Sequence, residues 1–161
     1  MAGVVLLAGV GAAVQTGCSG SAGDAVSRDA QVYVATIRDV LAEQPPPEEP
    51  DVLPLVYVVG VGEHDIPADV QAEVLGELDG DADIKFADQR SDVVLENDEE
   101  APVRDDGVLI AVGDLPQDVD PVELNVEIYR SEEEWSKVVL TVERRSSQWT
   151  VTSSSVLPAE S

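Results

Sequence analysis

The spacing of apolar residues predicts a helix in the first third of the chain. Between Ser27 and Glu43 apolar residues recur at helical spacing, which is typical of an amphipathic helix, and Ser27 is a suitable N-cap. The prolines Pro45 to Pro47 cannot continue a helix and favour an extended surface loop. The apolar face of the predicted helix comprises Ala30, Tyr33, Val34, Ile37, Val40 and Leu41.

A strand, a helix and a second strand are predicted next. Residues Leu53 to Val61 form a continuous apolar run rich in β-branched side chains, which indicates a strand buried on both faces at the centre of a sheet. A helix begins at Asp65 and ends at Asp79-Gly80, and Ile84 to Ala87 form the next strand. This order predicts a β-α-β unit, with a right-handed crossover if the two strands are parallel.

The remaining chain alternates between apolar and polar residues, as strands with one exposed face do. Residues 88–106 are polar and acidic and predict a loop, and Val108 to Val112 form an apolar strand. Apolar and polar residues then alternate in Val122–Tyr129, in Val138–Glu143 and from Trp149 to Ser153. These segments predict an antiparallel meander.

These patterns together predict an α+β fold. It has an N-terminal helix, one β-α-β unit and a C-terminal antiparallel β-meander, which form one mixed sheet with helices on one face. No internal repeat is visible, and no linker is long enough to separate two domains. We therefore expect a single domain over residues 27–161.

The charge of the chain limits its partners. It contains 33 acidic and 9 basic residues, for a net charge of -24, and its only lysines are Lys85 and Lys137. A polyanion would be repelled by such a protein, so a nucleic-acid partner is not expected. Direct adhesion to anionic lipid head groups is disfavoured for the same reason.

The N-terminus has the features of a signal peptide. Residues 2–14 carry no charge and are all apolar or small, which matches the length of a signal core and falls short of the roughly 20 residues that span a bilayer. The segment ends at Gln15-Thr16-Gly17-Cys18, where Cys18 is the only cysteine of the chain. A single thiol cannot form an intramolecular disulfide. We expect residues 1–17 to be a signal peptide.

Thr16-Gly17-Cys18 resembles the lipobox of bacterial lipoproteins. The resemblance implies that Cys18 is lipidated with fatty acyl chains such as palmitate, that residues 18–26 tether the domain, and that the protein lies on the extracytoplasmic face of the cell membrane. Gln15 stands where the lipobox has an aliphatic residue, and no basic residue precedes Arg28; a true translation start upstream of Met1 would explain the second departure. A cleaved but unlipidated form, or a buried N-terminal segment with an inert thiol, remains open.

The rest of the chain is similar to small lipoproteins of high-GC Gram-positive (actinobacterial) cells. The similarity rests on the helix motif Tyr33 to Arg38, the strand Val56-Tyr57-Val58, the strand Leu124 to Tyr129 and the terminal Trp149 to Val151. It implies no catalytic residue and no particular activity.

A glycine-containing turn is the first candidate for chemistry. Gly60-Val61-Gly62 follows the apolar strand and precedes a helix, and Asp88 follows the next strand, which outlines a dinucleotide-binding motif. The third glycine of that motif is replaced by Asp65, whose charge would repel a pyrophosphate. The sequence therefore favours a tight strand-to-helix turn, and we expect no cofactor.

Two acidic segments are candidates for calcium. Asp79 to Asp83 supplies the first alternating carboxylates of a calcium loop, but Ile84 and Arg90 stand where the loop needs its glycine and its closing glutamate. It is therefore not an EF-hand. Weak calcium binding there or at Glu96–Glu100 is left open, and we expect no dedicated metal site.

The remaining reactive and aromatic residues point to no catalytic site. His64 is the only histidine and lies between two acids, which predicts an exposed loop residue. The motifs H-E-x-x-H and G-x-S-x-G are absent. Trp149 is expected in the core, and the low aromatic content argues against an aromatic platform for sugars.

Two function classes follow. The first is a membrane-anchored, extracytoplasmic and non-catalytic binding or interaction module, held by membrane lipid through acylated Cys18, with an unknown protein or small-molecule partner. The alternative is an extracytoplasmic enzyme that uses carboxylates or a divalent metal. An enzyme would need acids that converge, for which Glu63, Asp65 and Asp88 are the candidates.

Overall fold

The computed structural model describes residues 22–45, 52–62 and 64–158. The predicted signal peptide, Cys18, most of the proline loop and Glu63 lie outside the described residues. The helices and strands are, in chain order, α1 (Ala22–Glu43), β1 (Leu55–Gly60), α2 (Ala68–Glu77), β2 (Asp83–Phe86), β3 (Val108–Val112), β4 (Val122–Tyr129), β5 (Trp135–Arg145) and β6 (Gln148–Val156).

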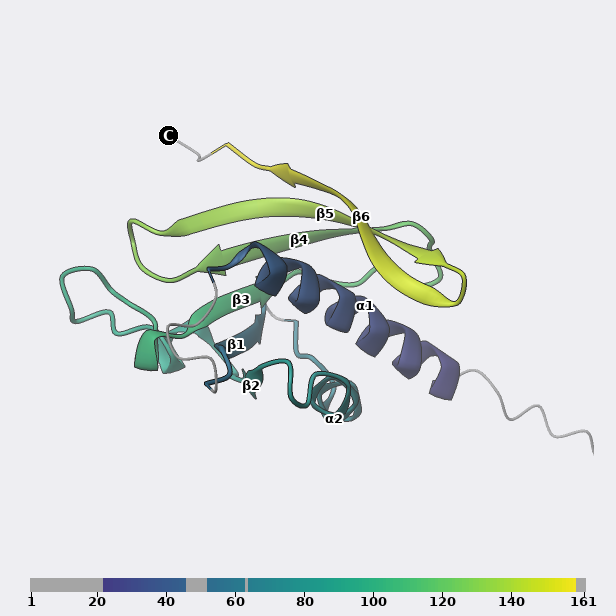
Figure 1. Cartoon of the computed structure of the whole chain (residues 1–161), viewed down its shortest axis with the longest axis horizontal. Coiled ribbons are helices and arrows are strands. Elements are labelled where there is room, and N and C mark those ends of the chain that lie inside the picture. The colour runs from purple at the N-terminus through teal and green to yellow at the C-terminus, as the bar shows by residue number, and fades with distance from the viewer. Residues whose placement is uncertain (1–21, 46–51, 63, 159–161) are drawn as a thin grey trace, which may run out of the picture.

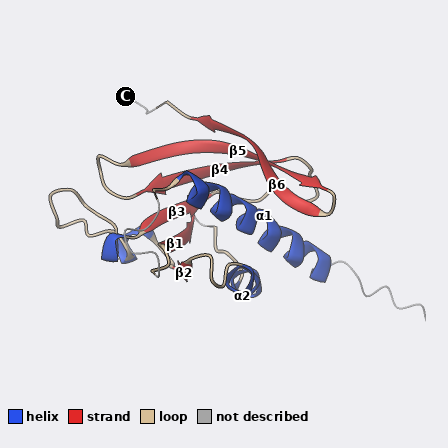
Figure 2. Cartoon of the chain, in the orientation of Figure 1, coloured by secondary structure: helices blue, strands red, loops and turns tan. Residues whose placement is uncertain are grey.

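The strands form one open mixed sheet in the order β2-β1-β3-β4-β5-β6 (Figures 1 and 2). β1 pairs in parallel with β2 on one side and with β3 on the other, and β3 to β6 pair antiparallel in succession. The predicted α+β fold, with its β-α-β unit and C-terminal meander, is thus confirmed. β1 is an inner strand, as its continuous apolar run predicted, and Val56 to Val59 are all buried.

Helix α1 begins earlier than the sequence predicted. It starts at Ala22, so Ser27 lies inside the helix, and the later part of the segment expected to be a tether is helical. At about 1.5 Å per residue, the 22 residues of α1 extend over about 33 Å.

Two arginines fix the position of α1 along the sheet. Near the start of the helix, Nη2 of Arg28 donates to the carbonyl oxygens of Pro116 and Val119, both at 2.9 Å. Just after its end, the Oε1 atom of Gln44 accepts hydrogen bonds from Arg130, at 3.0 Å from Nε and 2.8 Å from Nη2. The helix therefore runs from the β3–β4 connection at one end of the sheet to the β4–β5 connection at the other (Figure 1).

The main core lies between the two helices and one face of the sheet. Apolar side chains of α1 and α2 pack there against alternate residues of the strands. Trp149, predicted as core, is partly buried at its margin, with the guanidinium carbon of Arg28 5.4 Å from the ring centroid. The largest fully buried side chains include Ile37, Leu78, Ile110, Leu124 and Leu140.

The segment at residues 88–106, predicted only as a loop, covers part of the opposite face of the sheet. It contains two short 3-10 turns, Arg90–Asp92 and Arg104–Asp106, and a bridge between Val94 and Val103. Its apolar residues form a second, smaller core with the outer face of β1, β3 and the end of β4. This core comprises Tyr57, Val59, Val93, Val94, Ala101, Val103, Leu109, Ala111 and Tyr129.

Candidate functional site

Charged and aromatic side chains gather beside this second core, on the face of the sheet that the helices do not cover. We call Arg90, Glu127, Tyr129, Trp135 and Lys137 the Glu127 cluster. Strand alternation places the β4 and β5 members on one face, and the antiparallel register sets them directly opposite one another. Glu127 pairs with Lys137, and Tyr129 pairs with Trp135. Arg90 reaches them from the first 3-10 turn.

Glu127 holds both cations of the cluster. Its Oε1 atom accepts a hydrogen bond from Nη1 of Arg90, and its Oε2 atom lies 3.9 Å from the ammonium nitrogen of Lys137. The guanidinium of Arg90 also stacks on Tyr129, with its central carbon 3.7 Å from the ring centroid. One carboxylate and one ring therefore hold Arg90 in place.

The second core supports the cluster from below. Tyr129 is buried, and its hydroxyl donates a 2.8 Å hydrogen bond to the carbonyl oxygen of Ala101. At the turn that carries Arg90, the carboxylate of Asp92 accepts from the backbone N–H of Gln89 at 3.2 Å and from the side-chain amide of Gln89 at 3.4 Å. The ring on which Arg90 stacks and the turn from which it extends are thus both anchored by hydrogen bonds.

The cluster borders a surface hollow of about 630 Å³. Glu96 and Glu132 also line it, and Trp135 is 43% exposed beside it, with the ammonium nitrogen of Lys137 5.6 Å from its ring centroid. The side chains of Arg90 and Lys137 are 40% and 51% exposed, so their ion pairs contribute only about 0–1 kcal/mol to stability. The arrangement offers donors, acceptors and a flat apolar ring to a ligand.

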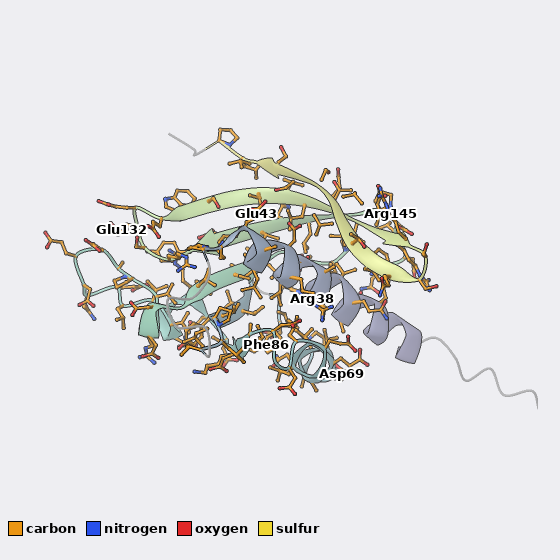
Figure 3. All side chains as sticks on the ribbon, in the orientation of Figure 1. Arg38, Glu43, Asp69, Phe86, Glu132 and Arg145 are labelled. Carbon is orange, nitrogen blue, oxygen red and sulfur yellow. The ribbon has the colours of Figure 1, made fainter. Side chains whose placement is uncertain are left out.

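The hollow lies at the end of the molecule far from the start of α1. Tyr129 precedes Arg130, which is bonded to Gln44 just beyond the other end of that helix. Figure 3 shows Glu132, from the rim of the hollow, at the end of the molecule opposite Arg145. The start of α1 lies toward the Arg145 end (Figures 1 and 3).

A larger groove of about 830 Å³ lies between α1, α2 and the start of β6. Its polar rim includes Arg38, Asp39, Glu73 and Glu77, and Trp149 lines one wall. Arg38 is already paired with Asp81 at 3.1 Å and donates to the backbone oxygen of Glu77 at 2.9 Å. Because Trp149 is partly buried against the main core whereas Trp135 is 43% exposed beside its hollow, we favour the Glu127 cluster as the candidate site.

The glycine motif lies at the end of β1 and in the turn directly after it, and α2 begins at Ala68, not at the predicted Asp65. A Cβ atom on Gly60 would lie 1.8 Å from the backbone oxygen of His64, so only glycine permits this turn. Gly62 has a φ of 72°, in the left-handed region that favours glycine.

The prediction that His64 is exposed was wrong. Its side chain is 23% exposed, with Nδ1 2.9 Å from a carboxylate oxygen of Asp114 and Nε2 3.0 Å from the hydroxyl oxygen of Tyr33. Burial, and then the negative charges of Asp29 and Asp114, raise the pKa of Tyr33 well above its usual range. The hydroxyl therefore keeps its proton, and with a proton on Nδ1 the ring donates to Asp114 while Nε2 accepts from Tyr33. His64 joins α1 to the β3–β4 connection, which is a structural role.

The acidic segments show no metal centre. Among residues 22–45, 52–62 and 64–158, no group of three or more His, Cys, Asp or Glu side chains is arranged to hold a metal ion. In the candidate calcium loop, Asp81 pairs with Arg38 at 3.1 Å and Asp83 with Lys85 at 3.5 Å.

Comparison of the chain with models of protein families, with curated proteins and with solved structures finds no match. Within the described part of the chain, neither helix has the combination of length and hydropathy that crossing a bilayer requires.

Proposed function

We propose that the protein is an extracytoplasmic lipoprotein, anchored to the membrane through acylated Cys18, that acts as a non-catalytic binding module. The observation that carries the binding role is the Glu127 cluster, where an exposed tryptophan lies beside two cations and a carboxylate at a surface hollow. The lipobox-like Thr16-Gly17-Cys18 after an uncharged apolar segment supports the anchor.

The position of the cluster suits an anchored protein. Only residues 19–21 lie between Cys18 and the start of α1, so an acylated Cys18 keeps that end of the helix near the membrane. The cluster lies beyond the other end of α1, which extends over about 33 Å. The binding surface would therefore point away from the bilayer, toward ligands in the cell envelope.

The geometry of Glu127 favours binding over catalysis. A carboxylate that already accepts from Arg90 and lies beside Lys137 serves as a fixed hydrogen-bond acceptor. No observation among the described residues favours the alternative of an enzyme that uses carboxylates or a divalent metal.

The anchor is tested with Cys18→Ala, and Ser19→Ala is the matched control. In the native host, Cys18→Ala should move the protein from the membrane fraction to the soluble fraction, whereas Ser19→Ala should remain membrane-bound. Mass spectrometry of the mature protein should show acyl chains on an N-terminal cysteine. An unmodified cysteine, or a mature protein that starts at Met1, contradicts the anchor.

The orientation is tested by thiol labelling of intact cells. Cys18 is the only cysteine, so once it is acylated an introduced cysteine is the only free thiol. A membrane-impermeant maleimide should label the Glu132→Cys variant at the rim of the hollow without cell lysis. Labelling only after lysis contradicts the extracytoplasmic location.

A further inference from the structure

The Glu127 cluster also indicates the chemical class of its ligand. We propose that it binds an uncharged glycan chain of pyranose rings with equatorial substituents. This inference rests on the proposed binding function and names the ligand of that site.

The low aromatic content of the sequence argued against an aromatic platform for sugars, but the structure exposes the single ring of Trp135, which supplies a surface for one sugar. A pyranose with equatorial hydroxyls has two faces of C–H groups, which pack on an aromatic ring and remove apolar surface from water. Trp135 is 43% exposed at the first position of β5, whereas the other tryptophan, Trp149, is partly buried against the main core. Trp135 is therefore the tryptophan that offers more of its ring to a ligand.

The charged residues around this ring suit hydroxyl groups, because each hydroxyl both donates and accepts hydrogen bonds. Glu127 is an acceptor, and Arg90 and Lys137 are donors within contact of it. A guanidinium carries five N–H donors and an ammonium three, so both retain donors beyond those that face Glu127. Hydrogen bonds from hydroxyls to charged groups are stronger than those between neutral groups.

The charge balance favours an uncharged ligand over an acidic one. The hollow is lined by two cations, Arg90 and Lys137, against three carboxylates, those of Glu96, Glu127 and Glu132. The chain as a whole carries a net charge of -24. A polyanion would meet repulsion from both sources, whereas a neutral glycan meets none.

The hollow is at the surface, and its volume of about 630 Å³ falls within the range of small-molecule sites. One stacked ring with a few hydrogen bonds that compete with water gives weak affinity, with a Kd of about 1 mM for a short oligosaccharide. Repeated sugars along a polymer would raise the apparent affinity.

The two tryptophans provide an internal control for the test, because the chain contains Trp135 and Trp149 and no others. In a ¹⁵N-labelled sample of the full chain, in a phosphocholine detergent without sugar head groups, each indole N–H gives one NMR signal, and the Trp135→Phe variant assigns them. Cellohexaose and chitohexaose, both β-1,4-linked and equatorial, should shift the Trp135 signal saturably and leave the Trp149 signal unchanged.

Matched variants connect the shift to the cluster. Glu127→Gln should weaken binding at least tenfold. Glu123→Gln, which changes an exposed carboxylate on the same face of β4, should leave the Kd within twofold. Equal weakening by both variants would contradict a specific role for Glu127.

Two further probes separate failure of the ligand class from failure of the binding role. A shift of Trp135 with triglycine or oligogalacturonate, and none with the neutral hexamers, overturns the glycan inference and leaves a binding site of other specificity. No shift of Trp135 with any of the four probes at 10 mM, or about ten times the expected Kd, overturns the glycan inference and removes the support for binding at this cluster.

Discussion

The two faces of the sheet differ in what covers them and in what their side chains can do. On β4, Val122, Leu124 and Val126 point toward the helices and are buried, whereas Glu123 and Asn125 between them are exposed. Burial under the helices makes these apolar residues of the first face a source of stability. The opposite face keeps charged and aromatic side chains at its surface. The same strands thus carry the core on one face and the candidate site on the other.

The opposite face is itself divided into two parts. Residues 88–106 cover the part over β1, β3 and the end of β4, and the Glu127 cluster lies beside that cover. Tyr129 belongs to both, because it is buried in the second core and its ring stacks against Arg90. The small core on this face therefore positions the site, while the large core on the other face stabilises the fold.

The largest effect should come from removing a side chain of the main core. Leu124 is fully buried between sheet and helices, so Leu124→Ala should lower the free energy of unfolding by about 3 kcal/mol. The neighbouring Asn125→Ala, which changes the exposed face of the same strand, should cost less than about 0.5 kcal/mol. Urea denaturation measures both values. Similar losses in the two variants would mean that the faces do not differ in their contribution to stability.

The second prediction concerns a polar contact at the helix-covered face. His64→Ala removes the hydrogen-bond partner of the Tyr33 hydroxyl, which is buried, and should cost about 1.5 kcal/mol. In the Tyr33→Phe background the hydroxyl is absent, so the same histidine substitution should cost measurably less. Urea denaturation of the native protein, the two single variants and the double variant gives the coupling free energy between His64 and the Tyr33 hydroxyl. Equal costs in both backgrounds would show that the contact does not stabilise the fold.

The contacts of His64 could not be predicted from the sequence. Its position between two acids suggested exposure, but its partners come from distant segments: Tyr33 is 31 residues away in the chain, and Asp114 lies in the β3–β4 connection. Helical and strand periodicity report which face of an element is buried. They do not report which elements meet, so the pairing of the histidine could not be predicted.

Only part of the candidate site could be predicted, because periodicity does not report which elements meet. Alternation placed Glu127 and Tyr129 together on the exposed face of a predicted strand, and this is the face of the cluster. Pairing of Glu127 with Lys137 depends on the register of β4 and β5, and Arg90 is 37 residues from Glu127. The polar composition of residues 88–106 also concealed the few apolar residues that hold this segment against the sheet. The fold class followed from local patterns, whereas the site depends on tertiary contacts.

The third prediction tests whether the second core holds residues 88–106 against the sheet. Tyr129→Phe removes the hydroxyl that donates to Ala101, and should cost about 1 kcal/mol and increase proteolytic cleavage within residues 88–106. Tyr57→Phe is the matched control, because the hydroxyl of Tyr57 lies 3.4 Å from its acceptor on Asp105 and should contribute little. Limited proteolysis with urea denaturation compares the variants. Unchanged cleavage in Tyr129→Phe would show that this hydrogen bond does not hold the segment.

The smallest expected effect depends on pH and lies on the helix side of the molecule. Burial, and then the neighbouring charge of Glu43, raise the pKa of Asp39 above its usual value. A raised pKa in the folded state means that the contribution of Asp39 to stability is fully present below the unfolded pKa of about 3.9 and is lost as the pH rises through the folded value. Asp39→Asn should therefore be more stable than the native protein at pH 7, by less than about 0.5 kcal/mol, with the difference vanishing at about pH 3.

Thermal denaturation at a series of pH values measures this difference in stability. The control is Asp88→Asn, which removes an exposed aspartate and so corrects for the loss of one charge from a chain of net charge -24. If the two variants have the same pH profile, the gain comes from the overall charge and not from the surroundings of Asp39.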